Sequence, residues 1–189
     1  GTENAFADEM NFWAKKIGMN NTNFRNSSGW PDPDLITTAK DLNTLTTELI
    51  RRFPADKYPE LYPIFAKREF TFNKIRQPNR NPLVYSSAGA DGLKTGHTQA
   101  AGYCLVASAM ENDTRLISVV MGARDERTRA AESQKLLNYG FRYYETVNLY
   151  AAWSSLKRVR VWSGLHESLE VGLDDAIMLT IPRGGIVYS

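Results

Sequence analysis

The octapeptide Asp91-Gly-Leu-Lys-Thr-Gly-His-Thr98 opens the part of the chain in which apolar and β-branched residues predominate. Apolar runs follow at residues 102–110 and 115–121, and Glu111-Asn-Asp113 between them has the composition of a tight turn. This pattern predicts a β-hairpin. We therefore expect the octapeptide to lead into an antiparallel sheet, with its Lys-Thr-Gly triplet on an exposed strand.

The triplet has the residue types that a site for a carboxylate needs. Lys94 supplies an ammonium that favours anions, and the Thr95 hydroxyl can donate to a carboxylate. Gly96 lets a ligand approach the backbone because it has no Cβ. The next N–H, that of His97, can donate to an oxyanion, and the strand edge can pair with an extended peptide. The triplet alone is also compatible with an ordinary strand start and a solvated lysine.

Three amphipathic helices are predicted from the spacing of apolar residues, at about residues 2–18, 38–53 and 125–144. Thr2 and Thr38 stand where N-caps are expected, and Gly18 stands where a helix ends. Short strands are predicted at about residues 68–73, 159–162, 169–173 and 177–181, and a polar loop at 77–82. The expected apolar stripes of the helices are Phe6, Met10, Trp13 and Ile17; Leu42, Leu45 and Leu49; and Ala130, Leu137 and Phe141.

Composition excludes several classes of function. The 189 residues include 23 Lys and Arg against 21 Asp and Glu, so a net charge of +2 gives no support for a nucleic-acid partner. A single cysteine, Cys104, excludes a disulfide within the chain and any Cys-x-x-Cys site, and we expect its thiol to be buried. His97 and His166 are too far apart to suggest a histidine-rich metal centre. We expect no metal and no organic cofactor.

Several stretches, taken in order, resemble one family: low-molecular-weight penicillin-binding proteins, the serine-type D-alanyl-D-alanine carboxypeptidases. The resemblance implies an α/β (α+β) fold of the penicillin-binding-protein and β-lactamase type. Residues 1–148 would be the later part of the catalytic, transpeptidase-like domain, N-terminally incomplete. Residues 149–189, with LTIPRG near their end, would start a β-rich second domain. The stretches are GTENAFADEMN, GMNNTNFRNSSGWPDPD, TTAKDL, REFTFNKIRQPNRN, DGLKTGHTQAAGYCLVASA, RLISVVMGA and AAESQKLLNYGFRYYETV.

The resemblance also implies roles for individual residues. Lys94, Thr95 and Gly96 would contact the carboxylate of a D-Ala-D-Ala peptide or of a β-lactam, with Thr98 beside them. The His97 N–H would form half of an oxyanion hole. Arg80 would lie near the substrate carboxylate and Arg129 would support the Lys-Thr-Gly strand, since guanidinium suits carboxylate recognition. For both arginines a plain surface charge is the alternative.

The chain departs from the family pattern in its nucleophile. The family places a Ser-x-x-Lys on a helix, and then a Ser-x-Asn loop, before everything present here. The only Ser-x-x-Lys is Ser154-Ser-Leu-Lys157, which follows the Lys-Thr-Gly and runs into a strand-like segment, so we read it as a coincidence. Without the nucleophile and its lysine the covalent step is lost. We expect the chain alone to be inactive. A β-lactamase-like hydrolase or a non-catalytic binding module are the alternative functions.

The expected partners follow from the same resemblance. They are peptidoglycan stem peptides that end in D-Ala-D-Ala, and β-lactams, with acyl transfer as the parent reaction. The expected location is the bacterial periplasm or the outer face of the cytoplasmic membrane, with membrane contact only through a C-terminal anchor that is not in this sequence. Because a sheet without its N-terminal part exposes edges, we also expect a companion chain or self-association.

Overall fold

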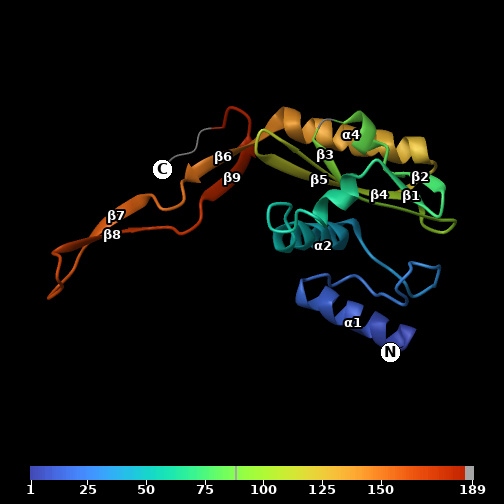
Figure 1. Ribbon diagram of the computed structural model, residues 1–189, viewed down its shortest axis with the longest axis horizontal. Coiled ribbons are helices and arrows are strands. Elements are labelled where there is room, and N and C mark those ends of the chain that lie inside the picture. The colour runs from blue at the N-terminus through green and yellow to red at the C-terminus, as the bar shows by residue number, and fades with distance from the viewer. Residues whose placement is uncertain (88, 186–189) are drawn as a thin grey trace. The chain divides into compact units, whose positions relative to one another are not determined.

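The computed structural model describes residues 1–87 and 89–185 and divides the chain into two units (Figure 1). The first unit is Gly1–Gly140 and the second is Phe141–Ser189. The predicted domain boundary, between residues 148 and 149, lies inside the second unit. The last four residues of the predicted second domain, 186–189, lie outside the described part of the chain.

The first unit is built on a three-stranded antiparallel sheet in the order β3-β4-β5. These strands are β3 (Ala90–Thr98), β4 (Gly102–Glu111) and β5 (Thr114–Ala123). Asn112 and Asp113, between β4 and β5, have φ angles of 46° and 62°. Asn and Asp tolerate this left-handed region, which a two-residue hairpin turn requires at both positions. The predicted hairpin is confirmed.

Helix α4 (Glu126–Tyr143) buries one stripe of its surface. The stripe recurs every four residues and consists of Arg129, Ser133 and Leu137. Alternate residues of β4 are fully buried as well, namely Leu105, Ala107 and Ala109. A Cβ added at Gly140 of this helix would come within 2.3 Å of Leu116 on β5, so the helix approaches the sheet closely. The predicted third helix is confirmed, but of its predicted stripe only Leu137 is buried, whereas Ala130 and Phe141 are half-buried.

Helix α2 (Ala39–Arg52) packs on β5 and β4 (Figure 1). The Thr38 hydroxyl caps it by accepting a bond from the N–H of Asp41 at 3.1 Å. The Asp41 carboxylate is buried and accepts bonds from the N–H of Asn21 and the hydroxyl of Thr22, at 2.8 and 2.7 Å. Asp41 therefore ties the preceding loop to the start of the helix.

Helix α1 (Glu3–Lys16) forms as predicted but buries a different face. Phe6 and Trp13 of the predicted stripe are exposed, whereas Ala7 and Ala14 are buried. The loop that follows approaches through Asn11, whose side chain exchanges two hydrogen bonds with the backbone of Phe24. Small alanine side chains next to Asn11 permit this close approach, so the stripe predicted from the large residues is wrong.

Between α2 and β3 lie a 3₁₀ helix, a small hairpin and a short helix. They are η1 (Tyr62–Ala66), β1 (Glu69–Phe72), β2 (Ile75–Pro78) and α3 (Leu83–Ser86). The predicted strand at 68–73 is confirmed. The predicted loop at 77–82 is wrong at its start, because Gln77 and Pro78 pair with Phe70 and Glu69. The pairing could not be predicted from residue polarity, because both strands are exposed along their whole length.

The second unit consists of two antiparallel strand pairs. Strand β6 (Tyr144–Tyr150) pairs with β9 (Ile177–Pro182), and β7 (Ser155–Arg160) pairs with β8 (Ser168–Gly172). The Ser154 hydroxyl donates to the carbonyl of Ala151 at 2.7 Å, directly before β7. Ser154 thus directly precedes β7 and Lys157 lies within it, so neither residue is on a helix. No helix within the described residues is long and apolar enough to cross a bilayer.

Candidate active site

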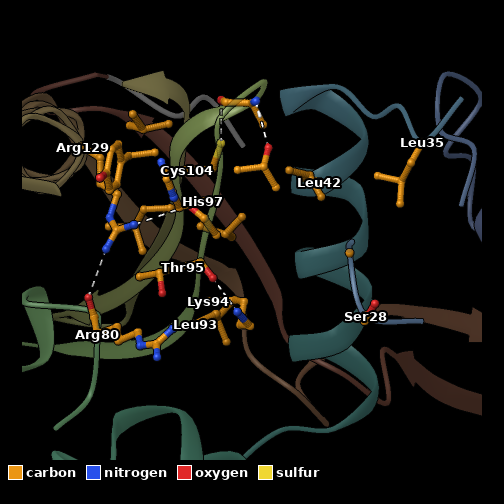
Figure 2. A pocket seen from close by; sticks show the side chains of 18 of the residues that line it. Ser28, Leu35, Leu42, Arg80, Leu93, Lys94, Thr95, His97, Cys104 and Arg129 are labelled. Atoms are coloured by element: carbon orange, nitrogen blue, oxygen red, sulfur yellow. Dashed lines mark hydrogen bonds between the residues drawn. The ribbon is translucent and has the colours of Figure 1, made fainter. Parts of the chain in front are cut away.

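A cavity of about 1170 Å³ opens in the first unit beside strand β3 (Figure 2). One wall is the run of β3 from Leu93 to Thr98, and helix α2 contributes an apolar wall. The loop residues 28–33 and Leu35 contribute further lining. The side chains of α2 that line it are Leu42, Leu45, Thr46 and Leu49. The structure therefore brings all five predicted residues of β3, 94–98, to one cavity.

Strand β3 is an edge strand within the part of the chain that the structure describes, because it pairs only with β4. An edge strand presents backbone N–H and C=O groups to whatever lies beside it. Next to a cavity, such an edge can pair with an extended peptide. The Lys-Thr-Gly triplet occupies the middle of this edge.

Successive side chains of β3 point to opposite faces of the sheet. Figure 2 shows Thr95 and His97 on the side of Arg80 and Arg129, and shows Leu42 of α2 on the other side of the strand. Lys94 is exposed, and its ammonium donates to the backbone carbonyl of Thr95. Among the described residues no carboxylate pairs with this ammonium, and Lys94 is one of the residues that line the cavity.

Gly96 leaves open space at the centre of the wall. A Cβ added there would meet no atom within 4 Å. Glycine is therefore not demanded by packing against neighbouring atoms of the chain. Its effect is to keep the strand surface flat where a ligand would approach the backbone.

Arg129 connects three parts of the site. The residue is buried, with 2% of its surface exposed. Its Nη1 donates to the carbonyl of Gly96 at 3.4 Å. Its Nη2 donates to the carbonyl of Arg80 at 3.3 Å, and its guanidinium lies 5.6 Å from the ring centroid of Tyr103. Tyr103 in turn stacks on His97, with centroids 3.9 Å apart. Arg129 thus braces β3 against the segment that carries Arg80.

The buried Nε of Arg129 has no hydrogen-bond partner among the described residues. The carboxylate of Glu126 lies 3.7 Å from Nη2 but is itself exposed. A buried guanidinium that is only partly satisfied adds a positive charge beneath the strand. This charge favours an anion in the cavity.

Arg80 is exposed and lines the cavity. Two asparagines hold it there. The buried Asn81 donates to the carbonyl of Gly92 at 2.8 Å and accepts from the N–H of Leu83 at 3.1 Å. Asn79 accepts a bond from the N–H of Asn81 at 2.9 Å. Sequence reasoning selected the arginine and missed these asparagines, although the Asn-Arg-Asn pattern was visible.

A second feature that sequence reasoning missed is a polar network at the start of β3. Nη1 of Arg115 donates to Asp91 Oδ2 at 2.7 Å and to Ser108 Oγ at 2.7 Å. The Tyr62 hydroxyl also donates to Asp91 Oδ2, at 3.1 Å. Burial, together with the negative charge of Asp91, raises the pKa of Tyr62 above its usual value of 10.0. This network holds the side chain of Asp91, the first residue of the octapeptide, in place.

The prediction that Cys104 is buried is wrong. The residue is half-buried, and it lines the cavity from β4, directly opposite Gly96. Its Sγ lies 3.5 Å from the carbonyl oxygen of Ala101. The residue opposite it has no side chain, and this uncovers the thiol in a way that the apolar pattern of β4 did not indicate.

The arrangement can bind an anionic peptide end, but among the described residues no serine paired with a base lines the cavity. Ser28 is the serine among the described lining residues, and its hydroxyl donates to Asn26 Oδ1 rather than to a base. Among the described residues, no group of three or more His, Cys, Asp and Glu side chains could hold a metal ion. The chemistry that this wall supports is carboxylate recognition and stabilisation of an oxyanion.

The chain matches a known protein family. The model of the D-alanyl-D-alanine carboxypeptidase family matches residues 1–125. The chain is 46% identical to the D-alanyl-D-alanine carboxypeptidase DacC of Escherichia coli over 185 residues, which is 97% of this chain and 45% of that protein. The chain spans about half the length of the curated relatives it matches.

Solved structures agree with this similarity. Penicillin-binding protein 5 from Haemophilus influenzae superposes with a TM-score of 0.82 at 40% identity, over 96% of this chain and 52% of that one. A penicillin-binding protein from Listeria monocytogenes, solved with ampicillin bound, superposes with a TM-score of 0.64 at 36% identity. That match covers 72% of this chain and 55% of the other.

Proposed function

The chain belongs to the D-alanyl-D-alanine carboxypeptidase family, and we propose that it forms the carboxylate-binding wall of a serine D-Ala-D-Ala carboxypeptidase. The observation that carries the proposal is the placement of Lys94, Thr95 and His97 along one edge strand that lines the cavity. Arg80 lines the same cavity, and Arg129 bonds to the strand from below. The substrates are peptidoglycan stem peptides that end in D-Ala-D-Ala.

Each residue of the wall has a distinct role in this proposal. The terminal carboxylate of the peptide lies at the open edge of β3. The ammonium of Lys94 and the hydroxyl of Thr98 reach it from one face of the sheet, and the hydroxyl of Thr95 and the guanidinium of Arg80 reach it from the other. The peptide lies along the free edge of β3, where Gly96 leaves room for it. Arg129 acts as a positioning residue, because it touches the strand rather than the ligand.

The parent reaction is acyl transfer. A serine attacks the carbonyl of the penultimate D-Ala, and the C–N bond to the terminal D-Ala breaks as that residue leaves with a proton on its amine. Water then hydrolyses the acyl-enzyme ester and regenerates the serine. The N–H of His97 donates to the oxyanion that forms in both steps. No serine paired with a base lines the cavity in the described residues, so the chain by itself binds the peptide without acylation.

β-Lactams are the second ligand class in this proposal, since their carboxylate would occupy the same position as that of the peptide. The support is the ampicillin-bound Listeria relative, which is 36% identical to this chain. We place the reaction in the bacterial periplasm or on the outer face of the cytoplasmic membrane, where peptidoglycan is found.

Equilibrium binding tests the proposal. Isothermal titration calorimetry would compare N-acetyl-D-Ala-D-Ala with its C-terminal amide. We expect binding of the free acid and at least tenfold weaker binding of the amide, because the amide has no negative charge for Lys94 and Arg80. Equal affinity for both ligands, or binding of neither, would refute the proposed function.

A further inference from the structure

The β1–β2 hairpin is flanked by residues that line the cavity. Phe65, four residues before β1, and Arg80, two residues after β2, are both lining residues. Asn79 closes its base: the side-chain amide donates to the carbonyls of Phe65 and Lys67 at 3.0 Å each. The N–H of Asn79 also donates to the carbonyl of Arg68 at 2.7 Å. The hairpin is therefore anchored by the residue next to Arg80.

One face of this hairpin is apolar and uncovered. Phe70, Phe72 and Ile75 are 54%, 68% and 63% exposed. They lie on the same face, because Phe72 pairs directly with Ile75 and Phe70 is two residues before Phe72. The two phenyl rings are nearly parallel, at 11°, with centroids 6.5 Å apart. A two-stranded hairpin cannot bury such a face by itself, so the face is available to a ligand.

The hairpin and its base are strongly basic. Residues 67–80 contain five cations, Lys67, Arg68, Lys74, Arg76 and Arg80, and one carboxylate, Glu69, a net charge of +4 against +2 for the whole chain. The carboxylate is neutralised by Arg76, whose Nε donates to it at 2.7 Å. Within residues 1–87 and 89–185, neither Lys67 nor Lys74 forms an ion pair, although the ammonium of Lys67 lies 5.4 Å from the Phe70 ring centroid.

We infer that the hairpin is a second binding surface, for the glycan-linked part of an anionic glycopeptide whose peptide end occupies the cavity. This inference rests on the proposed function. The apolar faces of sugar rings can pack on Phe70 and Phe72, and the carboxylates of the stem peptide can pair with Lys67 and Lys74. Both contacts are weak singly, and they add to the cavity contacts because one molecule makes both.

Position favours a glycopeptide over an anionic lipid surface. The hairpin is flanked on both sides by residues that line the cavity, Phe65 and Arg80, so a polymer held in the cavity by its peptide end has its next groups near the hairpin. No comparable feature of the described chain links the hairpin to a bilayer. Vesicle binding is accordingly an outcome that the experiment must be able to detect.

The test uses the purified chain and three probes: N-acetyl-D-Ala-D-Ala, a disaccharide-pentapeptide muropeptide, and vesicles of phosphatidylglycerol. Two hairpin variants are compared with the unaltered chain, F70S/F72S for the apolar face and K67E/K74E for the charge. Phe12→Ser is the matched control, because Phe12 is an exposed phenylalanine of the same unit outside the hairpin. Circular dichroism verifies that each variant is folded.

We expect both hairpin variants to weaken muropeptide binding about tenfold or more, with unchanged affinity for the dipeptide, and Phe12→Ser to change neither. Muropeptide binding that is unaffected by both variants would overturn the inference and leave the proposed function standing. Hairpin-dependent muropeptide binding without dipeptide binding would support the hairpin and refute the cavity assignment. Vesicle binding that is lost in F70S/F72S, with muropeptide binding unchanged, would overturn the inference in favour of a lipid partner.

Discussion

The guanidinium of Arg129 donates to the backbone carbonyl of Gly96 at 3.4 Å, across 33 residues of sequence. Through this bond helix α4 holds the strand that carries the Lys-Thr-Gly triplet. The same guanidinium holds the carbonyl of Arg80. The two segments that supply cations to the cavity are therefore braced by one buried side chain, and their spacing depends on it.

Arg129→Lys is expected to lower both stability and ligand affinity. A lysine keeps the charge but cannot bond two carbonyls in the planar geometry of a guanidinium. We expect a loss of about 1–3 kcal/mol in the free energy of unfolding, because a buried hydrogen-bonded group is left poorly satisfied. We also expect at least tenfold weaker binding of N-acetyl-D-Ala-D-Ala. Urea denaturation and calorimetry measure the two effects.

Arg127→Lys is the control for this variant, since Arg127 lies on the same helix and is exposed. It should change neither quantity. An Arg129→Lys protein that is destabilised but binds the dipeptide with unchanged affinity would reduce Arg129 to a purely structural residue.

Gly96→Val is expected to leave the fold intact and to obstruct the cavity. A Cβ at this position meets no atom within 4 Å, and β-branched residues suit a strand. Gly89→Val is the contrasting variant, because a Cβ there would lie 2.2 Å from the carbonyl oxygen of Met110. We expect Gly96→Val to keep its melting temperature and lose dipeptide binding, and Gly89→Val to melt earlier. Full dipeptide affinity in Gly96→Val would mean that the ligand does not lie against the strand.

Tyr62→Phe tests the polar network at the start of β3 through its pH dependence. Burial and the nearby Asp91 raise the pKa of Tyr62 in the folded chain. The unfolded chain therefore ionises this tyrosine first, so stability present below pH 10 is lost as the pH rises through the folded pKa. We expect the free energy of unfolding of Tyr62→Phe to fall less steeply above pH 10 than that of the unaltered chain. Parallel curves from pH 8 to 11, measured by urea denaturation, would contradict the pKa shift.

A fluorescent penicillin is expected to form no covalent adduct with the chain. No serine paired with a base lines the cavity in the described residues, and the one Ser-x-x-Lys begins with Ser154, whose hydroxyl donates to Ala151. Gel fluorescence and intact mass detect an adduct at stoichiometric yield. An adduct that disappears in Ser154→Ala would show that this serine is a nucleophile after all.

Local patterns predicted much of the fold. Alternating apolar residues and the Asn112-Asp113 turn predicted the β4–β5 hairpin, and the Thr38 cap predicted the start of α2. These features depend on residues close in sequence. The family resemblance was carried by whole stretches of sequence and is confirmed by the family match to residues 1–125.

Features that depend on distant contacts could not be predicted. The side chain of Asn81 donates a hydrogen bond to the carbonyl of Gly92 in β3. Arg115 donates one to the hydroxyl of Tyr62, which lies 53 residues away in the sequence. The α1 stripe was assigned from large residues, whereas contact with the loop through Asn11 buries the small ones. Cys104 is uncovered because the residue opposite it is a glycine, and only the register of β3 and β4 reveals this.

The most direct test of the carboxylate-binding wall is a ¹H–¹⁵N chemical-shift map of the chain titrated with N-acetyl-D-Ala-D-Ala. We predict that the largest shifts fall on the amides of residues 94–98 and on the side-chain Nε–H of Arg80, and that Lys94→Ala abolishes them. Shifts that avoid β3 altogether, or that persist unchanged in Lys94→Ala, would contradict the account.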